Sequence, residues 1–198
     1  PDKRLKTIST PIDAVSDDTR ALMDDMLETM YAANGIGLAA IQIGVPQRVI
    51  VMDIAPSSPD EGGDETSDKN RGENRDEEDD SAPANREDRY DLSGLEDEGP
   101  RYFVNPEITW ASDETNNYQE GCLSVPGFYE HIYRAAKVRV KALDRHGKPF
   151  EMDTDELMAV CVQHEIDHLD GKPMKDNLSS LKRNRNKTKL QKAQKKHA

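Results

Sequence analysis

Aromatic residues and long apolar runs are scarce in this chain of 198 residues. Phe, Trp and Tyr make up 5% of it and apolar residues of all kinds 34%, less than is typical of globular proteins. No stretch has the apolar pattern of a membrane span or a signal peptide. The only two cysteines, Cys122 and Cys161, exclude a disulfide framework and favour a reducing compartment. We therefore expect a cytoplasmic protein without membrane contact. The chain begins at Pro1 rather than Met, so we expect a processed or truncated N-terminus, which leaves an organellar matrix open.

The shortage of apolar residues has a local cause between positions 57 and 99. This stretch holds 17 Asp or Glu and 5 Lys or Arg, so its net charge of −12 equals that of the whole chain. The remaining residues, with 22 acidic and 22 basic side chains, are neutral. So polar a segment cannot bury enough surface to offset its ordering entropy. We predict one domain over 1–198, interrupted by a disordered insertion at about 57–99 that serves solubility or partner binding rather than catalysis.

Two of the five histidines stand together in the segment His-Glu-Ile-Asp-His at 164–168. Residues four apart share one face of a helix, so His164 and His168 can bind one metal ion, with Glu165 beside them as a general base. Asp167 could orient a ligated histidine through its second nitrogen, but we expect it to face solvent. The pattern indicates a metal-dependent hydrolase.

The third metal ligand is not obvious from the histidine motif alone. A catalytic metal usually takes three protein ligands and keeps a further position for water. Some zinc peptidases place a third histidine six residues after the motif, where this chain has Met174, and others use a downstream Glu, but no Glu follows His168. The ligand therefore comes from upstream or is one of two aspartates, Asp170 and Asp176.

The cysteines are the upstream candidates. Cys161 would lie about 10.5 Å from His168 along a helix axis, too far to share one metal with both histidines. Cys122 lies on another segment and can approach the helix from outside. Taken alone, a buried structural thiol is the simpler interpretation of Cys122.

Three segments, in this order, resemble the three motifs of the peptide deformylase family. They are Gly-Ile-Gly-Leu-Ala-Ala-Ile-Gln at 35–42, Glu-Gly-Cys-Leu-Ser at 120–124 and Gln-His-Glu-Ile-Asp-His at 163–168. The resemblance covers most of the chain but not the acidic insertion. Enzymes of this family remove the N-formyl group from the initiator methionine of nascent polypeptides, and the resemblance implies the same reaction here.

The resemblance also implies a role for individual residues. It implies a divalent metal, Fe(II) by preference with Zn(II) or Ni(II) as alternatives, held by Cys122, His164 and His168. Glu165 would act as general acid/base on the water that the metal activates, while Gln42 and the backbone N–H of Leu123 would donate to the formyl oxygen. Tyr129 falls where better-known relatives carry an Arg, which leaves the binding of the peptide backbone undefined. Substrate contacts are expected from Ile36, Gly37, Glu120, Gly121, Leu157, Val160 and Cys161.

Hydrophobic periodicity and turn signals predict an α+β fold. We expect antiparallel or mixed β-sheets packed around a central metal-binding helix, with a further helix near each end of the chain. The first helix is capped by Asp17 or Asp18 and runs to about Ala33. The motif helix is capped by Thr154, runs to Asp170 and buries the stripe that carries its histidines. The predicted strands are 48–54, 101–110, 119–120, 128–133 and 137–144.

The C-terminal segment is strongly basic. Residues 182–198 hold 8 Lys or Arg and no acidic side chain. We expect a solvated helix that begins near Ser179 or Ser180, and contact with the ribosome is the alternative that the resemblance suggests. The expected partners are thus formyl-Met nascent polypeptides and, through this tail, the ribosome, for a protein that we expect to be a monomer.

Two other functions fit parts of the sequence. A zinc endopeptidase shares the His-Glu-x-x-His motif, but the missing third histidine and the missing downstream Glu argue against it. A binding protein with a structural metal and a nucleic-acid-binding tail would need a fourth protein ligand, and the sequence offers no good candidate.

Overall fold

The computed structural model describes residues 3–54, 99–125, 129–172 and 174. Its helices are α1 (Asp17–Ala32) and α2 (Glu156–Leu169), with the short 3-10 helices η1 (Lys3–Lys6) and η2 (Ala40–Ile43). Its strands are β1 (Gly37–Ala39), β2 (Val49–Met52), β3 (Arg101–Ala111), β4 (Thr115–Gly121), β5 (Tyr129–Ala135), β6 (Lys137–Leu143) and β7 (Pro149–Asp155). None of the described helices is both long and apolar enough to cross a membrane. The predicted disorder at 57–98 and the predicted C-terminal helix lie outside the described residues.

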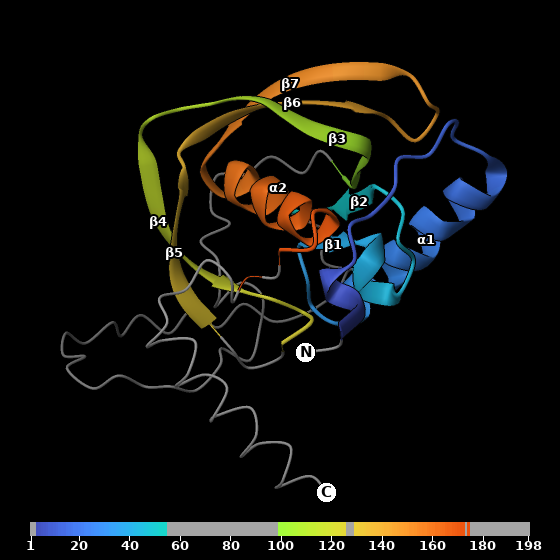
Figure 1. Ribbon diagram of the computed structural model, residues 1–198, viewed down its shortest axis with the longest axis horizontal. Helices are drawn as coiled ribbons and strands as arrows, with labels where there is room; N and C mark the ends of the chain where they lie inside the picture. Colours follow the sequence, from blue (N-terminus) through green and yellow to red (C-terminus); the bar gives the residue numbers. More distant parts are fainter. Residues whose placement is uncertain (1–2, 55–98, 126–128, 173, 175–198) are drawn as a thin grey trace, which may run out of the picture.

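Two antiparallel sheets enclose helix α2. Five strands form one sheet in the order β1-β2-β3-β6-β7, and β4 pairs with β5 in a separate hairpin. Figure 1 shows α2 inside the curve of these strands, with α1 at the outer side of β1 and β2. The predicted α+β fold with a central helix is confirmed.

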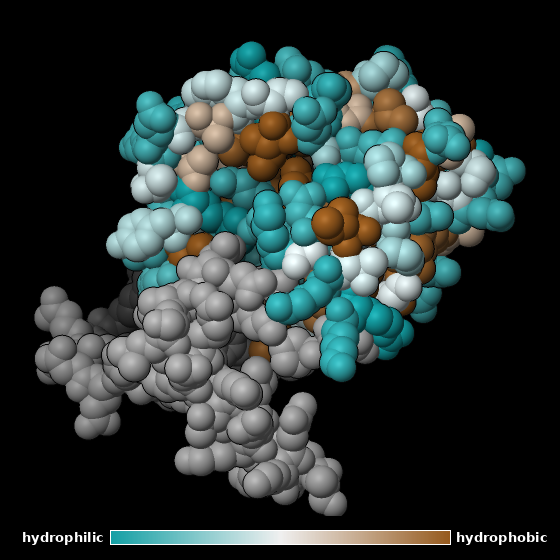
Figure 2. All heavy atoms as spheres, in the orientation of Figure 1, coloured by the Kyte–Doolittle hydropathy of each residue, from teal (hydrophilic) through white to brown (hydrophobic). Residues whose placement is uncertain are grey.

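The position of each strand explains its sequence. Strand β2 reads Val-Ile-Val-Met and is buried throughout, because Val49 and Val51 pack in the cluster around α1 while Ile50 and Met52 pack in the cluster around α2. Strand β6 has only one buried face, so Val, Val and Ala alternate there with exposed Lys and Arg. The molecular face in Figure 2 is accordingly mostly hydrophilic, with apolar side chains in separate patches.

Helix α1 forms where it was predicted, but its cap is a different residue. Ser16 has extended backbone geometry, and its hydroxyl accepts a hydrogen bond from the Thr19 N–H at 3.2 Å. The Thr19 hydroxyl in turn accepts from the Ser16 N–H at 3.3 Å, which completes a capping box. The prediction of Asp17 or Asp18 as the cap was therefore wrong, because both already belong to the first helical turn.

The N-cap of helix α2 lies one residue later than predicted, because Thr154 belongs to the strand before the helix. Residues 149–155 pair in register with β6, with Thr154 opposite Val138, and Asp155 takes the N-cap position. Strand β7 was not predicted, although its residues alternate in type, and its inward residues are only half buried because it lies at the edge of the sheet. The helix ends at Leu169 with Asp170 as its C-cap, within one residue of the prediction. The next residue, Gly171, has a φ of +69° and approaches the Lys6 carbonyl oxygen too closely to leave room for a side chain.

Candidate metal centre

Helix α2 and the end of strand β4 bring three metal-ligating side chains together. His164 and His168 lie one turn apart on the inner face of α2, and Cys122 directly follows β4. Ligand atoms of these three buried residues all lie within 4.8 Å of one another, and the Cys122 sulfur is 3.2 Å from His168 Nε2. Asp170 is occupied elsewhere, because its carboxylate binds Arg48 at 2.8 Å, and Asp176 lies outside the described residues.

The electrostatics of this group fit a cation. Burial lowers the pKa of His164, but its hydrogen bonds with Cys122 and Glu120 outweigh burial and raise that pKa well above its usual value. Burial and the neighbouring His164 charge lower the pKa of His168 to about 3. The buried Nδ1 of His168 has no hydrogen-bond partner among the residues that the structure describes. A thiolate with two imidazoles is also a known donor set of catalytic metals, so the residues present fit a divalent ion.

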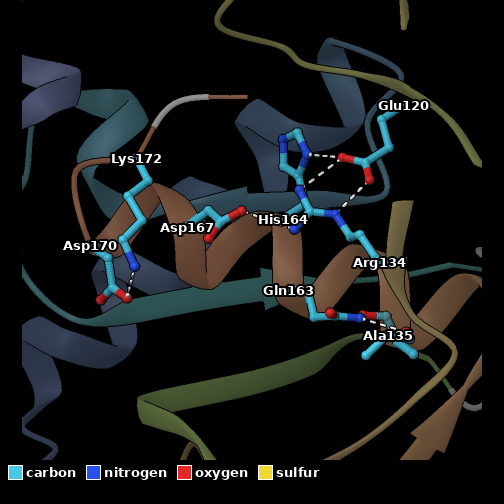
Figure 3. A network of polar contacts seen from close by, with 9 residues as sticks. Glu120, Arg134, Ala135, Gln163, His164, Asp167, Asp170 and Lys172 are labelled. Atoms are coloured by element: carbon cyan, nitrogen blue, oxygen red, sulfur yellow. Dashed lines mark hydrogen bonds and ion pairs between the residues drawn. The ribbon is translucent and has the colours of Figure 1, made fainter. Parts of the chain in front are cut away.

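An ion-pair network lies behind His164. Glu120 Oε2 is 2.8 Å from His164 Nδ1, and Arg134 donates to both oxygens of the Glu120 carboxylate, at 2.5 and 3.0 Å. The hydrogen bonds from His164 and Arg134 outweigh burial and lower the pKa of Glu120. A carboxylate accepts here, so the His164 Nδ1–H donates and Nε2 is left as the ligand atom. Figure 3 shows Glu120 between the imidazole and the guanidinium.

Asp167 does not simply face solvent, as the sequence analysis expected. Its side chain is 22% exposed and accepts a hydrogen bond from Arg134 Nη1 at 2.9 Å. The residue that contacts the second nitrogen of a histidine is Glu120, whereas Asp167 anchors the other end of the guanidinium. The sequence signal for Glu120 was its position two residues before Cys122, inside the second motif.

Glu165 lies between the two histidines in sequence and against strand β1 in space. A Cβ atom on Gly37 would stand 2.8 Å from Glu165 Oε1 and 2.7 Å from the Cys161 sulfur, so only glycine lets β1 approach α2 this closely. Burial raises the pKa of the Glu165 carboxyl to about 7. Its Oε2 has no hydrogen-bond partner within the described part of the chain. The carboxyl can therefore exist in either protonation state near neutral pH.

The amide of Gln42 has a defined orientation. The Ala39 N–H donates to Gln42 Oε1 at 2.8 Å, so the NH₂ group must point the other way. Nε2 lies 3.1 Å from the Ser124 hydroxyl and 3.9 Å from the Cys122 sulfur. The Gln42 NH₂ group thus lies beside Cys122, one of the three metal-ligating side chains.

One pocket of about 270 Å³ adjoins these groups. Gln42, Leu123 and Glu165 line it, and two tyrosines, Tyr118 and Tyr129, lie at its wall. All the residues predicted to contact substrate line the same pocket: Ile36, Gly37, Glu120, Gly121, Leu157, Val160 and Cys161. The structure brings these residues together, and their individual roles stay predictions.

Residues 1–184 match the family model described as polypeptide deformylase. The chain belongs to this family. The peptide deformylase of Stutzerimonas stutzeri (strain A1501) is 48% identical over 198 residues, which cover 100% of this chain and 95% of that protein. That of Phenylobacterium zucineum (strain HLK1) is 48% identical over 183 residues, covering 92% of this chain and 86% of that protein.

Solved structures of peptide deformylases are similar to this fold. The enzyme from Legionella pneumophila superimposes with a TM-score of 0.74 at 38% identity, covering 100% of this chain and 93% of that one. The enzyme from Ehrlichia chaffeensis in complex with actinonin gives 0.73 at 34% identity, covering 98% and 93%. The predicted family and the predicted enzyme class are confirmed.

Two residues of this deformylase site escaped the sequence analysis. Arg134 holds Glu120, and Ser124 accepts from the Gln42 amide. Ser124 stands inside the second motif, so its position next to Leu123 was a usable signal. Arg134 gave none, because its partners depend on how the β4–β5 hairpin curves around α2.

Proposed function

We propose that this enzyme removes the N-formyl group from the N-terminal formyl-methionine of nascent polypeptides. The observation that carries the proposal is one pocket lined by Gln42, Glu165 and two members of the Cys/His/His group, Cys122 and His164. A divalent metal held by Cys122, His164 and His168 would supply Lewis acidity and a water nucleophile at neutral pH. The family resemblance favours Fe(II), with Zn(II) and Ni(II) as alternatives, although the ligand set by itself does not select iron over zinc.

Glu165 is suited to move the proton. Hydrolysis of a formamide requires a base to take a proton from the attacking water and an acid to return it to the leaving amine. A buried carboxyl with a pKa of about 7 can do both near neutral pH, since neither form is strongly favoured. The close passage of Gly37 keeps Oε1 in a fixed place at the pocket wall.

Gln42 and Leu123 are suited to bind the formyl oxygen as negative charge develops on it. Gln42 and Leu123 both line the pocket, and the Gln42 NH₂ group lies beside Cys122, the residue before Leu123. Oxyanion donors act through preorganisation, and the hydrogen bond from Ala39 already fixes the Gln42 carbonyl oxygen. Removing one such donor costs about 2.7–4 kcal/mol of transition-state stabilisation.

The inner part of the pocket suits an unbranched apolar side chain. Ile36, Leu157, Val160 and Cys161 are all buried and line it beside Glu165. An apolar wall with a few convergent polar groups is the usual form of a small-molecule or side-chain site. We propose that the methionine side chain lies here and that the rest of the peptide leaves past Gly121 and Tyr129.

The Glu165→Gln variant tests this mechanism. We expect it to retain its metal and to release formate from formyl-Met-Ala-Ser at least about 10²-fold more slowly, because the amide cannot accept the proton. The matched control is Glu151→Gln on the exposed strand β7, which should behave as the parent. Unchanged turnover would refute the role of Glu165. Cleavage of an internal peptide bond without deformylation, with the Fe(II), Zn(II) or Ni(II) enzyme, would overturn the proposed reaction.

We further propose a monomeric, single-domain protein that works in the cytoplasm and contacts the ribosome through the basic segment 182–198. The support is the charge of that segment, which lies outside the described residues. If the protein truncated after Leu181 co-sediments with ribosomes as well as the full chain does, the proposed contact between segment 182–198 and the ribosome is wrong. We also propose that the acidic insertion takes no part in catalysis, so that deletion of residues 60–98 should leave deformylation intact.

A further inference from the structure

The two proposed oxyanion donors come from distant parts of the chain. Gln42 lies on η2 of the first half, and Leu123 follows β4 in the second. Both must reach one small oxygen atom, so their separation has to be fixed. We propose that Ser124 is a positioning residue whose hydroxyl fixes the Gln42 amide beside the Leu123 N–H. This inference rests on the proposed deformylase function.

The Gln42 amide needs a second fixed point. The hydrogen bond from Ala39 holds only its oxygen, and the terminal torsion of a Gln side chain is broad. Ser124 Oγ accepts from Nε2 at 3.1 Å, which fixes the other end of the amide. The contact from Nε2 to the Cys122 sulfur, at 3.9 Å, is too long to do this alone. With one N–H bound to Ser124, the other is directed toward the metal-ligating group.

Ser124 shares a turn with the other donor. The Val125 N–H donates to the Cys122 carbonyl oxygen at 2.9 Å, so Leu123 and Ser124 are the central residues of a tight turn. The turn therefore holds a proposed metal ligand, a proposed oxyanion donor and the hydroxyl that fixes Gln42, 82 residues away in sequence. Movement of the turn would carry the Gln42 amide with it.

The turn itself is held by a contact that does not involve Ser124. The Leu123 side chain fills the space beside Gly35, where a Cβ atom would stand 2.6 Å from Leu123 Cδ1. Removing the Ser124 hydroxyl should therefore leave the turn in place and free only the amide. This separates a positioning role from a general structural one.

The test compares Ser124→Ala, Ser124→Thr and a control, Ser112→Ala, in the holoenzyme. Ser112 lies before β4, away from the pocket, where its hydroxyl donates to the Glu114 carbonyl oxygen at 2.9 Å and accepts from the Lys137 N–H at 3.0 Å. We expect S124A to lower kcat about three- to tenfold relative to the parent, which corresponds to the net free energy of one neutral hydrogen bond. KM should stay within about twofold of the parent value. S124T should recover most of the loss, and S112A should match the parent. Metal content and thermal midpoint should be the same in all four proteins.

Two further measurements isolate the Gln42 contact. In a Gln42→Ala background, S124A should lower kcat no further, because the two residues act as a unit. In ¹⁵N-labelled metal-free protein, the side-chain amide resonances of Gln42 should shift in S124A and stay in place in S112A. The resonance measurement does not depend on turnover.

The outcomes separate the two ideas. If Gln42→Ala leaves kcat unchanged, the proposed oxyanion role of Gln42 is wrong, and the inference falls with it. If Gln42→Ala lowers kcat about 10²-fold while S124A leaves kcat and the Gln42 amide resonances unchanged, the function stands and the inference is overturned. Additive losses in the double variant would also overturn it.

Discussion

Two arginines of this structure make the same kind of contact in opposite surroundings. Arg134 on β5 binds the Glu120 carboxylate through two hydrogen bonds, and these side chains are 7% and 4% exposed. Arg139 on β6 binds the Asp153 carboxylate through two hydrogen bonds, at 2.6 and 2.9 Å, and these side chains are 46% and 67% exposed. Each arginine also has a second carboxylate nearby, Asp167 for Arg134 and Glu151 for Arg139.

The comparison shows that geometry alone does not define what an ion pair does. Water and salt screen the outer pair, which competes with good hydration of both groups. The inner pair has lost its water, so each charge depends on the other. The inner carboxylate also contacts His164, one of the proposed metal ligands, whereas the outer pair lies away from the metal centre.

Arg134→Met is the strongest way to break this comparison. It removes the guanidinium but keeps most of the side-chain volume, and it leaves the buried Glu120 carboxylate with His164 as its remaining partner. We expect the free energy of unfolding to fall by about 3–5 kcal/mol, the usual cost of an uncompensated buried charge. Guanidinium unfolding of the metal-free protein measures it without interference from metal binding. A loss below about 1 kcal/mol would mean that Glu120 finds other partners or becomes neutral at little cost.

Glu120→Gln tests whether the inner carboxylate contributes to metal binding through His164. The amide oxygen can still accept from His164 Nδ1–H, but it lacks the charge that strengthens the imidazole as a ligand. We expect affinity for Zn(II) to fall about 10- to 100-fold, as for other partners of ligating histidines. Competition with a chromogenic chelator measures it, with Glu151→Gln as the matched control on the outer face. Equal Zn(II) affinities of the two variants would show that Glu120 does not contribute to metal binding.

The sequence predicted those parts of the site that depend on local spacing. His164 and His168 are four residues apart on a helix, so their common face follows from helical geometry alone. Cys122 could be placed beside them only through the order of the three motifs, because spacing cannot say which loop reaches a helix. Thr154 was misplaced because a Thr just before a helical pattern is a common N-cap, although Phe150, Met152 and Thr154 also alternate with acidic residues as in a strand.

The buried network shows where local patterns stop. Arg134 lies on the β4–β5 hairpin and Asp167 on α2, and their contact exists only because the hairpin curves around the helix. An Asp inside a helix most often faces solvent, so the expectation for Asp167 followed the common case. The same limit applies to Ser124 and Gln42, whose hydrogen bond joins segments that no periodicity relates.

Arg139→Met should have the smallest effect. Arg139 on β6 and Asp153 on β7 are paired in register, and their two hydrogen bonds lie on the solvent side of the sheet. Water can therefore replace these hydrogen bonds when the guanidinium is removed. At physiological ionic strength we expect the unfolding midpoint and the Zn(II) affinity to match the parent, because a Debye length of about 8 Å screens the exposed charges. At low salt, a slight loss of stability should emerge as screening weakens. Urea unfolding at physiological and at low salt measures the change in stability under each condition. A loss of stability at physiological salt comparable to that of Arg134→Met would show that burial does not account for the difference between the two arginines.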